Sequence, residues 1–400
     1  MKPAAILDIG SSKVVCLYGS AAQKDGIVVH GAGVAPYDGF IDGAFLDRQS
    51  LHTAVVDAIN KAEAESCMRI RDVALTVPPS FSKLELSDST ITLGSRARRT
   101  EGADVDRLIA QSLKKAKTPE GYVLMHSTPV FFLVDGVSST ELPIGLETDE
   151  LSGLVSHMFV KEEYIKTVQD TLDEMGVEIS MCISAALGEA VMLIPEAERV
   201  RPAVLIDVGY YQTDVSIIES AAITGLATLP IGGYHFSSDL AFGLEVPLEI
   251  AEQAKRRYVF SLDYKDKTEV LRNEKGSKRV ALSAISLIVE ARAEELCLLI
   301  RKEISDMGVN AQARPATYLS GGGFLMMRGA LDFMKKALGL SIKRDMPYTP
   351  RLSSSNYCSA FGALNFVLRA NGAEEETLSK QNEPEEGSIL LKKVKEFFTK

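Results

Sequence analysis

The sequence predicts an α/β protein with two similar halves. Short apolar runs typical of buried strands occur at 4–9, 73–77 and 203–208. Longer stretches with helical periodicity lie between and after them, at 50–65, 103–116, 161–175 and 281–307. This alternation is typical of an α/β fold.

Length and composition limit the possible functions. At 400 residues the chain exceeds one ordinary domain, and 46% apolar with 24% charged residues excludes a mainly disordered chain. A balance of 44 basic to 54 acidic residues gives a net charge of −10, so nucleic acid is not an expected partner. Asp8 interrupts the apolar start, so no secretion signal is expected. Five scattered cysteines without a CxxC pair favour neither disulfides nor a zinc site, and the chain is expected to be cytosolic.

Three glycine-containing units follow predicted strands: LDIGSSKV at 7–14, LIDVGYYQTDV at 205–215 and TYLSGGGFL at 317–325. The first two share an apolar strand, an Asp, an apolar residue, a Gly and a second apolar run. This similarity indicates an internal repeat, although two unrelated hairpins could also produce it. The third unit predicts a strand that turns into a helix.

The chemistry of these units favours an anionic ligand. A glycine turn lets backbone N–H groups approach an anion, and Ser11, Ser12 and Lys13 add hydroxyl donors and a positive charge. Asp8 is placed to hold Mg²⁺ through water. The segment 207–214 could act in the same way from the opposite side of a triphosphate, while an ordinary polar hairpin remains the alternative for each unit.

Two regions differ in residue pattern from the rest of the chain. Residues 80–156 predict a small α+β insertion whose Arg96, Arg98 and Arg99 form either a solvated face or a contact with another subunit. Residues 243–310 predict a second, helix-rich and charged insertion.

The C-terminal end combines an acidic segment with a basic amphipathic one. Residues 373–387 carry six Glu and one Lys, which predicts a disordered linker. Residues 388–400 predict a helix that binds an anionic membrane reversibly, or alternatively docks on the protein's own body or on a partner. The expected membrane contacts are Leu390, Leu391, Lys392, Lys393, Val394, Phe397 and Phe398.

Taken together, the three units resemble the two phosphate loops and the adenosine loop of the actin-type ATPase superfamily. Within it, the chain is similar to the FtsA family of bacterial cell-division proteins. The similarity extends to LPIGGYHFSSDLAFGLEVPLEIAEQAKRRY at 229–258, IVEARAEELCLLIRKEI at 288–304, the DVDR segment at 104–107 and the terminal helix. It implies an actin-like two-lobed fold of duplicated ribonuclease H-like domains.

The resemblance also implies domain boundaries. The first lobe would comprise 1–79 and 157–200, with 345–372 returning to it, and would carry the inserted subdomain 80–156. The second lobe would comprise 201–242 and 311–344, with 243–310 as a helical insertion subdomain. A linker at 373–387 and a membrane-targeting helix at 388–400 would complete the chain.

The ligand implied by the resemblance is ATP with Mg²⁺. Asp8 and Asp207 would hold the metal. The expected nucleotide contacts are Gly10, Ser11, Ser12, Lys13, Gly209, Thr213, Gly232, Gly233, Glu252, Lys255, Gly321, Gly322, Gly323 and Phe324. No catalytic residue is assigned, because Tyr210, Tyr211 and Gln212 replace two glycines and a threonine of the family's second phosphate loop. The tyrosines are expected to restrict φ and fill space, leaving hydrolysis weak or absent.

The implied function is to self-assemble into filaments and to tether the tubulin-like division protein FtsZ to the cytoplasmic face of the membrane. The C-terminal peptide of FtsZ would dock on 243–310, and the chain itself would be a peripheral membrane protein. Two alternatives remain. One is a small-molecule kinase or phosphatase of the same superfamily, and the other is an actin-like scaffold of another membrane machine such as pilus assembly.

Overall fold

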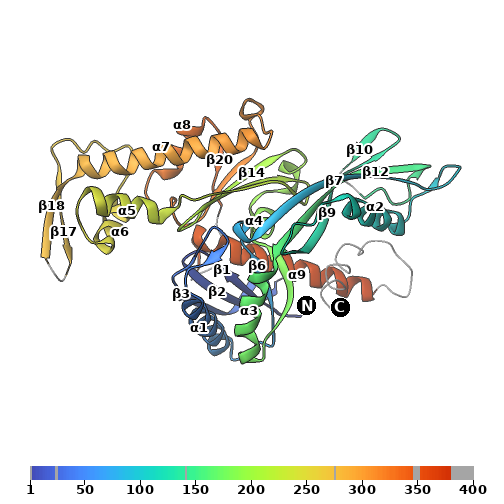
Figure 1. The fold of residues 1–400 in the computed structure, drawn as a ribbon, viewed down its shortest axis with the longest axis horizontal. Helices are drawn as coiled ribbons and strands as arrows, with labels where there is room; N and C mark the ends of the chain where they lie inside the picture. Colours follow the sequence, from blue (N-terminus) through green and yellow to red (C-terminus); the bar gives the residue numbers. More distant parts are fainter. Residues whose placement is uncertain (1, 23–25, 140–141, 274–275, 346–351, 380–400) are drawn as a thin grey trace. The chain divides into compact units, whose positions relative to one another are not determined.

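A computed structural model describes residues 2–22, 26–139, 142–273, 276–345 and 352–379 (Figure 1). The chain divides into two compact units. Unit 1 comprises residues 1–201, 218–226 and those from 359 onward, and unit 2 comprises residues 202–217 and 227–358.

Unit 1 is built on a five-stranded sheet with the order β13-β6-β1-β2-β3. Its strands are β1 (Ala4–Ile9), β2 (Lys13–Ala21), β3 (Ile27–Pro36), β6 (Asp72–Val77) and β13 (Glu178–Ser184). β1 pairs antiparallel with β2 across the first glycine turn and parallel with β6. β1 is almost fully buried, which explains its continuous apolar sequence. A short hairpin, β4 (Phe40–Ile41) and β5 (Ala44–Phe45), follows β3.

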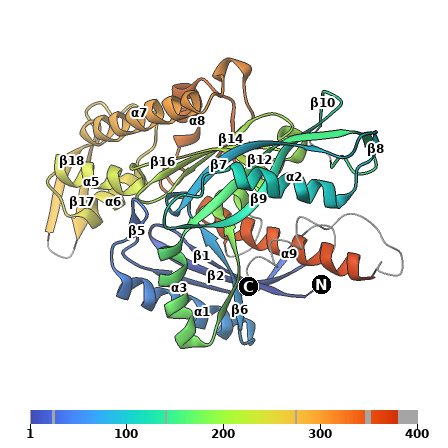
Figure 2. The same cartoon turned by 45° about the vertical axis from the view of Figure 1, so that its right-hand side comes forward.

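Helices cover both faces of this sheet (Figures 1 and 2). α1 (Arg48–Ser66) and α3 (Glu162–Met175) lie on one face, and α4 (Ala185–Leu193) and α9 (Cys358–Ser379) lie on the other. α1 packs directly on β3: a Cβ built on Gly33 would lie 1.8 Å from the carbonyl oxygen of Ala58. Glycine at this position is therefore required for the helix to approach the sheet.

Unit 1 also carries a separate subdomain with its own core. Four strands, in the order β10-β9-β12-β7, form its sheet, and β8 pairs with β11 at one end. Helix α2 packs on this sheet through Val105 and Leu108. The elements are β7 (Ser82–Thr92), β8 (Arg98–Arg99), α2 (Gly102–Lys115), β9 (Tyr122–Val134), β10 (Val137–Ser139), β11 (Glu147–Thr148) and β12 (Glu150–Lys161).

Side chains of α2 cap the edge strand β7. Residues four apart on a helix and two apart on a strand both advance about 6 Å, so the two elements match in register. The three hydrogen bonds run from Arg107 to the Thr92 carbonyl (2.8 Å), from Gln111 to that of Thr90 (3.2 Å) and from Lys115 to that of Asp88 (3.2 Å). These donors satisfy carbonyl groups that an edge strand would otherwise leave open to another chain.

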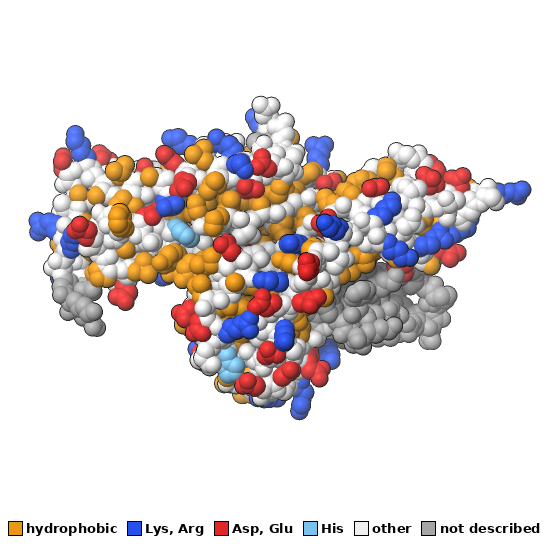
Figure 3. Space-filling view, in the orientation of Figure 1, with side chains coloured by type: hydrophobic (Ala, Val, Ile, Leu, Met, Phe, Trp, Pro, Cys, Tyr) orange, Lys and Arg blue, Asp and Glu red, His pale blue; other side chains and the backbone are white. Residues whose placement is uncertain are grey.

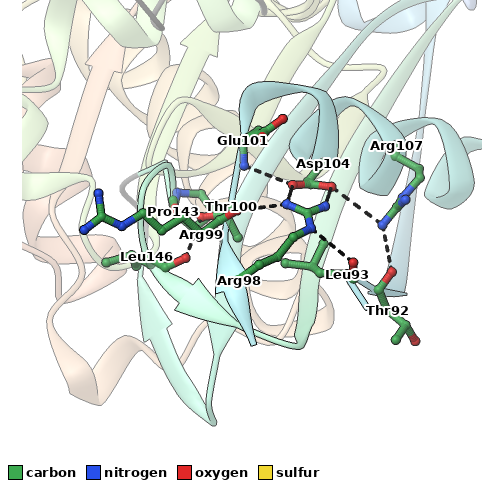
Figure 4. Close-up of polar contacts among 10 residues, drawn as sticks. All are labelled: Thr92, Leu93, Arg98, Arg99, Thr100, Glu101, Asp104, Arg107, Pro143 and Leu146. Atoms are coloured by element: carbon green, nitrogen blue, oxygen red, sulfur yellow. Dashed lines mark hydrogen bonds and ion pairs between the residues drawn. The ribbon is translucent and has the colours of Figure 1, made fainter. Parts of the chain in front are cut away.

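The start of α2 is fixed by a bidentate ion pair between Arg98 and Asp104 (Figure 4). Both Nη atoms of Arg98 donate to the carboxylate, at 2.8 and 2.6 Å. The same carboxylate accepts the backbone N–H of Glu101 at 3.0 Å. These interactions hold the pKa of Asp104 below its ordinary value, chiefly through the hydrogen bond with Arg98. Of the predicted arginine cluster, Arg98 therefore has a structural role.

Unit 2 contains a second five-stranded sheet with the order β16-β15-β14-β19-β20. Its strands are β14 (Ala203–Val208), β15 (Thr213–Glu219), β16 (Ala222–Leu229), β19 (Thr317–Ser320) and β20 (Ile342–Lys343). β14 corresponds to β1: the strand after its glycine turn is its neighbour on one side, and a parallel strand lies on the other. The internal repeat predicted from the two Asp–apolar–Gly turns is therefore present.

Four helices and a hairpin complete unit 2. The helices are α5 (Gly233–Gly243), α6 (Leu248–Arg257), α7 (Leu282–Asp306) and α8 (Ala330–Leu338), and the hairpin is β17 (Thr268–Asn273) with β18 (Gly276–Ala281). One hydrophobic core runs from β14 through α5 to α7, with Val208, Phe236 and Val289 fully buried. Among the described residues, no helix is long and apolar enough to cross a membrane. None of the five cysteines, all of which lie in the described part of the chain, forms a disulfide.

Three sequence-based expectations differ from the structure. The segment 243–310 is not wholly helical, because it includes the β17–β18 hairpin. After β19 the chain makes turns, and a helix begins only at Ala330, because Gly321 and Gly329 both adopt positive φ. α9 continues to Ser379, so the start of the predicted disordered linker is helical; Ala, Glu and Leu in AEEETLS are strong helix formers.

The subdomain also holds two histidines in neutral form, of which His157 is buried and His126 is partly buried. On β12, His157 is fully buried, and its two ring nitrogens hydrogen bond to Ser112 (2.9 Å) and Ser127 (2.8 Å). Burial lowers the pKa of both His126 and His157 to about 4, and the charge of His157 also disfavours protonation of His126. Protonation therefore opposes folding of this subdomain.

We predict that resistance to urea falls as the pH drops from about 6.5, the ordinary histidine pKa, towards 4. The loss is at most about 3 kcal/mol for one imidazole. His157→Gln should flatten the pH dependence of the urea midpoint, and His52→Gln, which changes a partly exposed histidine, should leave it unchanged. An equally steep pH dependence in the His157 variant would contradict this assignment.

Candidate functional site

The first glycine turn, between β1 and β2, is closed by its own backbone. Gly10 N–H donates to the Lys13 carbonyl at 3.0 Å, and the Tyr37 hydroxyl donates to the Gly10 carbonyl at 2.8 Å. A Cβ built on Gly10 would meet only the Lys13 oxygen, at an ordinary 3.4 Å. The fold therefore does not itself require glycine at position 10, whereas a ligand that approaches the backbone closely would.

Asp8 is buried at the end of β1 and held by two hydroxyl groups. Its Oδ1 accepts hydrogen bonds from Thr76 (2.7 Å) and Ser359 (2.8 Å). Burial raises the pKa of Asp8, and these hydrogen bonds and the charge of Lys13 oppose the rise. The carboxylate is thus rigidly oriented, and a nearby cation would offset the cost of burying its charge.

The second glycine turn, between β14 and β15, packs backbone against backbone with two other turns of unit 2. A Cβ on Gly323 would lie 2.0 Å from the Gly209 carbonyl oxygen, and one on Gly232 would lie 2.6 Å from that of Tyr210. A Cβ on Gly321, whose φ is +84°, would lie 2.2 Å from Oδ1 of Asp207. Side chains are therefore excluded at all three glycines, and Gly209, Gly232 and Gly321–Gly323 form a single cluster.

Hydrogen bonds join this cluster to the start of α5. The N–H groups of Gly233 and Tyr234 donate to the carbonyls of Gly209 (2.9 Å) and Tyr210 (2.7 Å), and Gly323 N–H donates to that of Val208 (2.7 Å). Gly232 N–H donates to Nδ1 of His235 at 3.0 Å, so the ring carries its proton on Nε2 when neutral. These hydrogen bonds hold the second glycine turn against the start of α5.

Tyr210 and Tyr211 form an aromatic cluster with Tyr234 over this turn. Their ring centroids lie 4.8 to 5.7 Å apart. Burial raises the pKa of Tyr210 above its ordinary value. Neither Tyr210 nor Tyr211 has a positive φ, so this turn does not need left-handed residues at these two positions. The rings nonetheless occupy space beside the turn.

Asp214 and Gln212 lie buried beneath the same turn. Asp214 accepts hydrogen bonds from Nε2 of Gln212 (3.1 Å) and from Thr228 (2.6 Å). Burial and the charge of Asp207 raise the pKa of Asp214 to about 7. Oε1 of Gln212 is buried without a hydrogen-bond partner. A ligand or water that donates a hydrogen bond would satisfy this oxygen.

Lys255 and Glu252 on α6 support the start of α5. Nζ of Lys255 is buried and donates to the Gly233 carbonyl (2.8 Å) and to Glu252 (2.6 Å). Glu252 also accepts from Ser237 at 2.5 Å. Burial lowers the pKa of Lys255, and Glu252 opposes this shift. Both predicted nucleotide contacts are therefore already engaged in positioning Gly233.

The donor set fits magnesium held mainly through water. Within the described residues, no group of three or more His, Cys, Asp or Glu side chains is arranged to hold a metal. Magnesium in nucleotide sites is commonly bound by one or two carboxylates, retained water and phosphate oxygens. In unit 1, Asp8 ends its strand before the glycine turn, as Asp207 does in unit 2, and each can supply one such carboxylate.

In unit 2 the structure brings most of the predicted site residues into one connected group. Gly209, Thr213, Gly232, Gly233, Glu252, Lys255 and Gly321–Gly323 are linked by the contacts above, Thr213 through its bond to the Ile231 carbonyl (2.6 Å). Phe324 instead lies fully buried in the core. Thr76, Ser359 and Tyr234 were missed, because only the folded chain brings them to the turns. The predicted membrane contacts lie outside the described residues.

The sequence is similar to those of known proteins. Residues 204–362 match the family model described as cell division protein FtsA. The chain is 24% identical to the cell division protein FtsA of Neisseria meningitidis, over 92% of this chain and 91% of that protein. It is 25% identical to the one of Streptococcus pneumoniae, over 98% and 87%. The resemblance to the FtsA proteins is confirmed.

Solved structures show the fold. A type IV pilus biogenesis complex, PilM–PilN, matches with a TM-score of 0.62 at 15% identity, over 91% of this chain and 98% of that chain. MreB5 of Spiroplasma citri bound to ADP matches with a TM-score of 0.52 at 14% identity, over 96% and 99%. The predicted actin-like fold is therefore confirmed.

We predict that Gly323→Ala destabilises unit 2 by ~3 kcal/mol or more, because its Cβ would collide with the Gly209 carbonyl in a rigid backbone cluster. Gly94→Ala is the matched control: its Cβ would meet the Arg96 backbone oxygen at 3.5 Å and nitrogen at 4.0 Å, both ordinary contacts, and its effect should stay within about 1 kcal/mol. Urea unfolding followed by circular dichroism measures both. Equal stability of the two variants would refute the close packing.

Proposed function

We propose that the chain is an ATP-binding, actin-like cell-division protein that self-assembles and tethers FtsZ filaments to the cytoplasmic membrane. The observation that carries this proposal is the repeated Asp–apolar–Gly turn, present at equivalent places in two sheets of the same strand order. The similarity to FtsA proteins over more than nine-tenths of the chain supports a role in cell division.

Each glycine turn would contribute to binding Mg-ATP in its own way. In unit 1, Gly10 to Lys13 would contact phosphate, because the Gly10 backbone is open and Lys13 supplies positive charge. In unit 2, the preassembled turn would offer Gly209 and Thr213 to phosphate and Gly321–Gly323 to the nucleoside. Asp8 and Asp207 would hold Mg²⁺, which neutralises phosphate charge when bound.

Nucleotide would act as an assembly ligand, with weak or absent hydrolysis. The pKa of Asp214 is raised to about 7, as would suit a general base, but its oxygens already accept hydrogen bonds from Gln212 and Thr228. The rings of Tyr210 and Tyr211 lie over the same turn. Both features favour binding without rapid turnover.

Partner binding would use two other regions. Within 243–310, α7 exposes Leu287 (73%) and Leu298 (61%), and α5, which ends where this segment begins, exposes Phe242 (88%). Exposed apolar side chains of this size suit a peptide partner, and we assign the C-terminal peptide of FtsZ to this surface. Residues 388–400 would bind anionic lipid, and assembly would multiply this weak single anchor.

The pilus-scaffold alternative gains nothing from the match to the PilM–PilN complex, since 15% identity supports a common fold alone. The kinase or phosphatase alternative would require phosphoryl transfer or release well above background. It leaves the basic amphipathic segment at 388–400 without a role.

We predict that the full chain with ATP recruits FtsZ filaments to vesicles containing anionic lipid, as measured by co-sedimentation. Phe397→Glu with Phe398→Glu should reduce binding of the chain to vesicles by about tenfold or more, because each change removes an apolar anchor worth roughly 1.5 kcal/mol or more. Lys166→Glu with Lys336→Glu, at exposed sites far along the sequence, is the control. Normal vesicle binding without FtsZ recruitment would refute the tethering role.

A further inference from the structure

Helix α2 and the residue pair beyond it present a basic face, which we define as Arg107, Lys114, Lys115 and Lys117. All four side chains are exposed. Figure 3 shows Lys and Arg side chains gathered over this part of the subdomain. The chain as a whole carries a net charge of −10, so this face is opposite in sign to the average surface.

Only part of this charge serves the fold. Arg107 and Lys115 cap carbonyls of β7, and Lys114 and Lys115 lie in the last turn, where positive charge interacts well with the helix dipole. The nearby acidic groups include Asp104, 3.6 Å from Arg107, Asp88, 3.9 Å from Lys115, and the half-buried Asp106. Within the described residues, Lys117 lies past the helix end and makes no ion pair. The basic face thus retains positive charge that is available to an acidic partner.

An acidic segment of this chain begins in the same unit. Residues 374–387 contain six Glu and one Lys, a net charge of 1 − 6 = −5. α9 ends at Ser379, and in both Figures 1 and 2 its last turns run beneath α2. The seven residues from Ser379 to Glu386 can span at most about 25 Å when extended. A connection of this length limits how far residues 383–386 can lie from the end of α9.

We propose that the acidic segment, residues 374–387, binds the basic face of α2 in the same chain. Opposite charges at several positions, held at high effective concentration by the short connection from α9, favour this contact over one between separate chains. The contact is electrostatic and exposed, so it weakens as salt rises.

The contact would control the segment that follows it. Residues 388–400 come directly after the acidic segment, so docking would restrain them beside α2 and reduce their access to a lipid surface. This consequence rests on the proposed membrane role. The contact itself does not, and it can be measured without lipid.

The test is the distance between spin labels at Ala110→Cys and Gly387→Cys in the full chain, with Cys67→Ser removing the exposed cysteine. Double electron–electron resonance at low salt should show a population of short distances, below about 30 Å, that is lost at 0.5 M salt, where screening acts within about 4 Å. Lys114→Glu with Lys117→Glu should remove that population. Lys166→Glu with Lys336→Glu makes the same change of net charge and should retain it.

A charge swap decides between specific contact and general repulsion. Adding Glu385→Lys and Glu386→Lys to the Lys114/Lys117 variant should restore the short distances. Absence of short distances in the parent chain, or their survival in the Lys114/Lys117 variant, would overturn the proposal. Loss of the short distances on dilution with unlabelled chain would also overturn it, by showing contact between two copies.

Discussion

In unit 2, three segments contact one another directly through their backbones, and the rest of the unit is built around this contact. The Gly209 carbonyl receives the N–H of Gly233 and lies where a Cβ of Gly323 would be. β14, the start of α5 and the turn after β19 therefore meet at one point, and the core behind them is continuous from Val208 to Phe236. Because protein interiors are close-packed, a single added methyl group cannot be absorbed there.

Unit 1 has the same strand order as unit 2, but its glycine turn is not packed against other backbone segments. Gly10 has room for a Cβ, and its turn is closed by Lys13 and Tyr37 instead of by neighbouring glycines. In unit 2 the glycine turn is packed against other backbone, whereas in unit 1 an open backbone lies beside a buried, oriented carboxylate on Asp8. The two halves share a strand order, but glycine has a different local reason in each.

The sequence predicts the strands and glycine turns well because their signals are local. β1, β6 and β14 are buried apolar runs, and each Asp–apolar–Gly unit follows a strand directly. Contacts between distant segments could not be predicted: Ser359 reaches Asp8 from α9, and Lys255 reaches Gly233 from α6. The charge of 373–379 predicted disorder, but the helix propensity of this segment extends α9. The φ values of Tyr210 and Tyr211 could be known only from the structure of the turn.

The most direct test of the account is calorimetric titration of the chain, truncated before Ser388, with Mg-ATP, beside the Gly10→Ala variant. We predict saturable binding at submillimolar concentration, weakened about tenfold or more in the variant, since its fold is unaffected while its added methyl group obstructs phosphate. Absence of binding by the parent chain, or equal affinity of the two proteins, would contradict a nucleotide site at the first glycine turn.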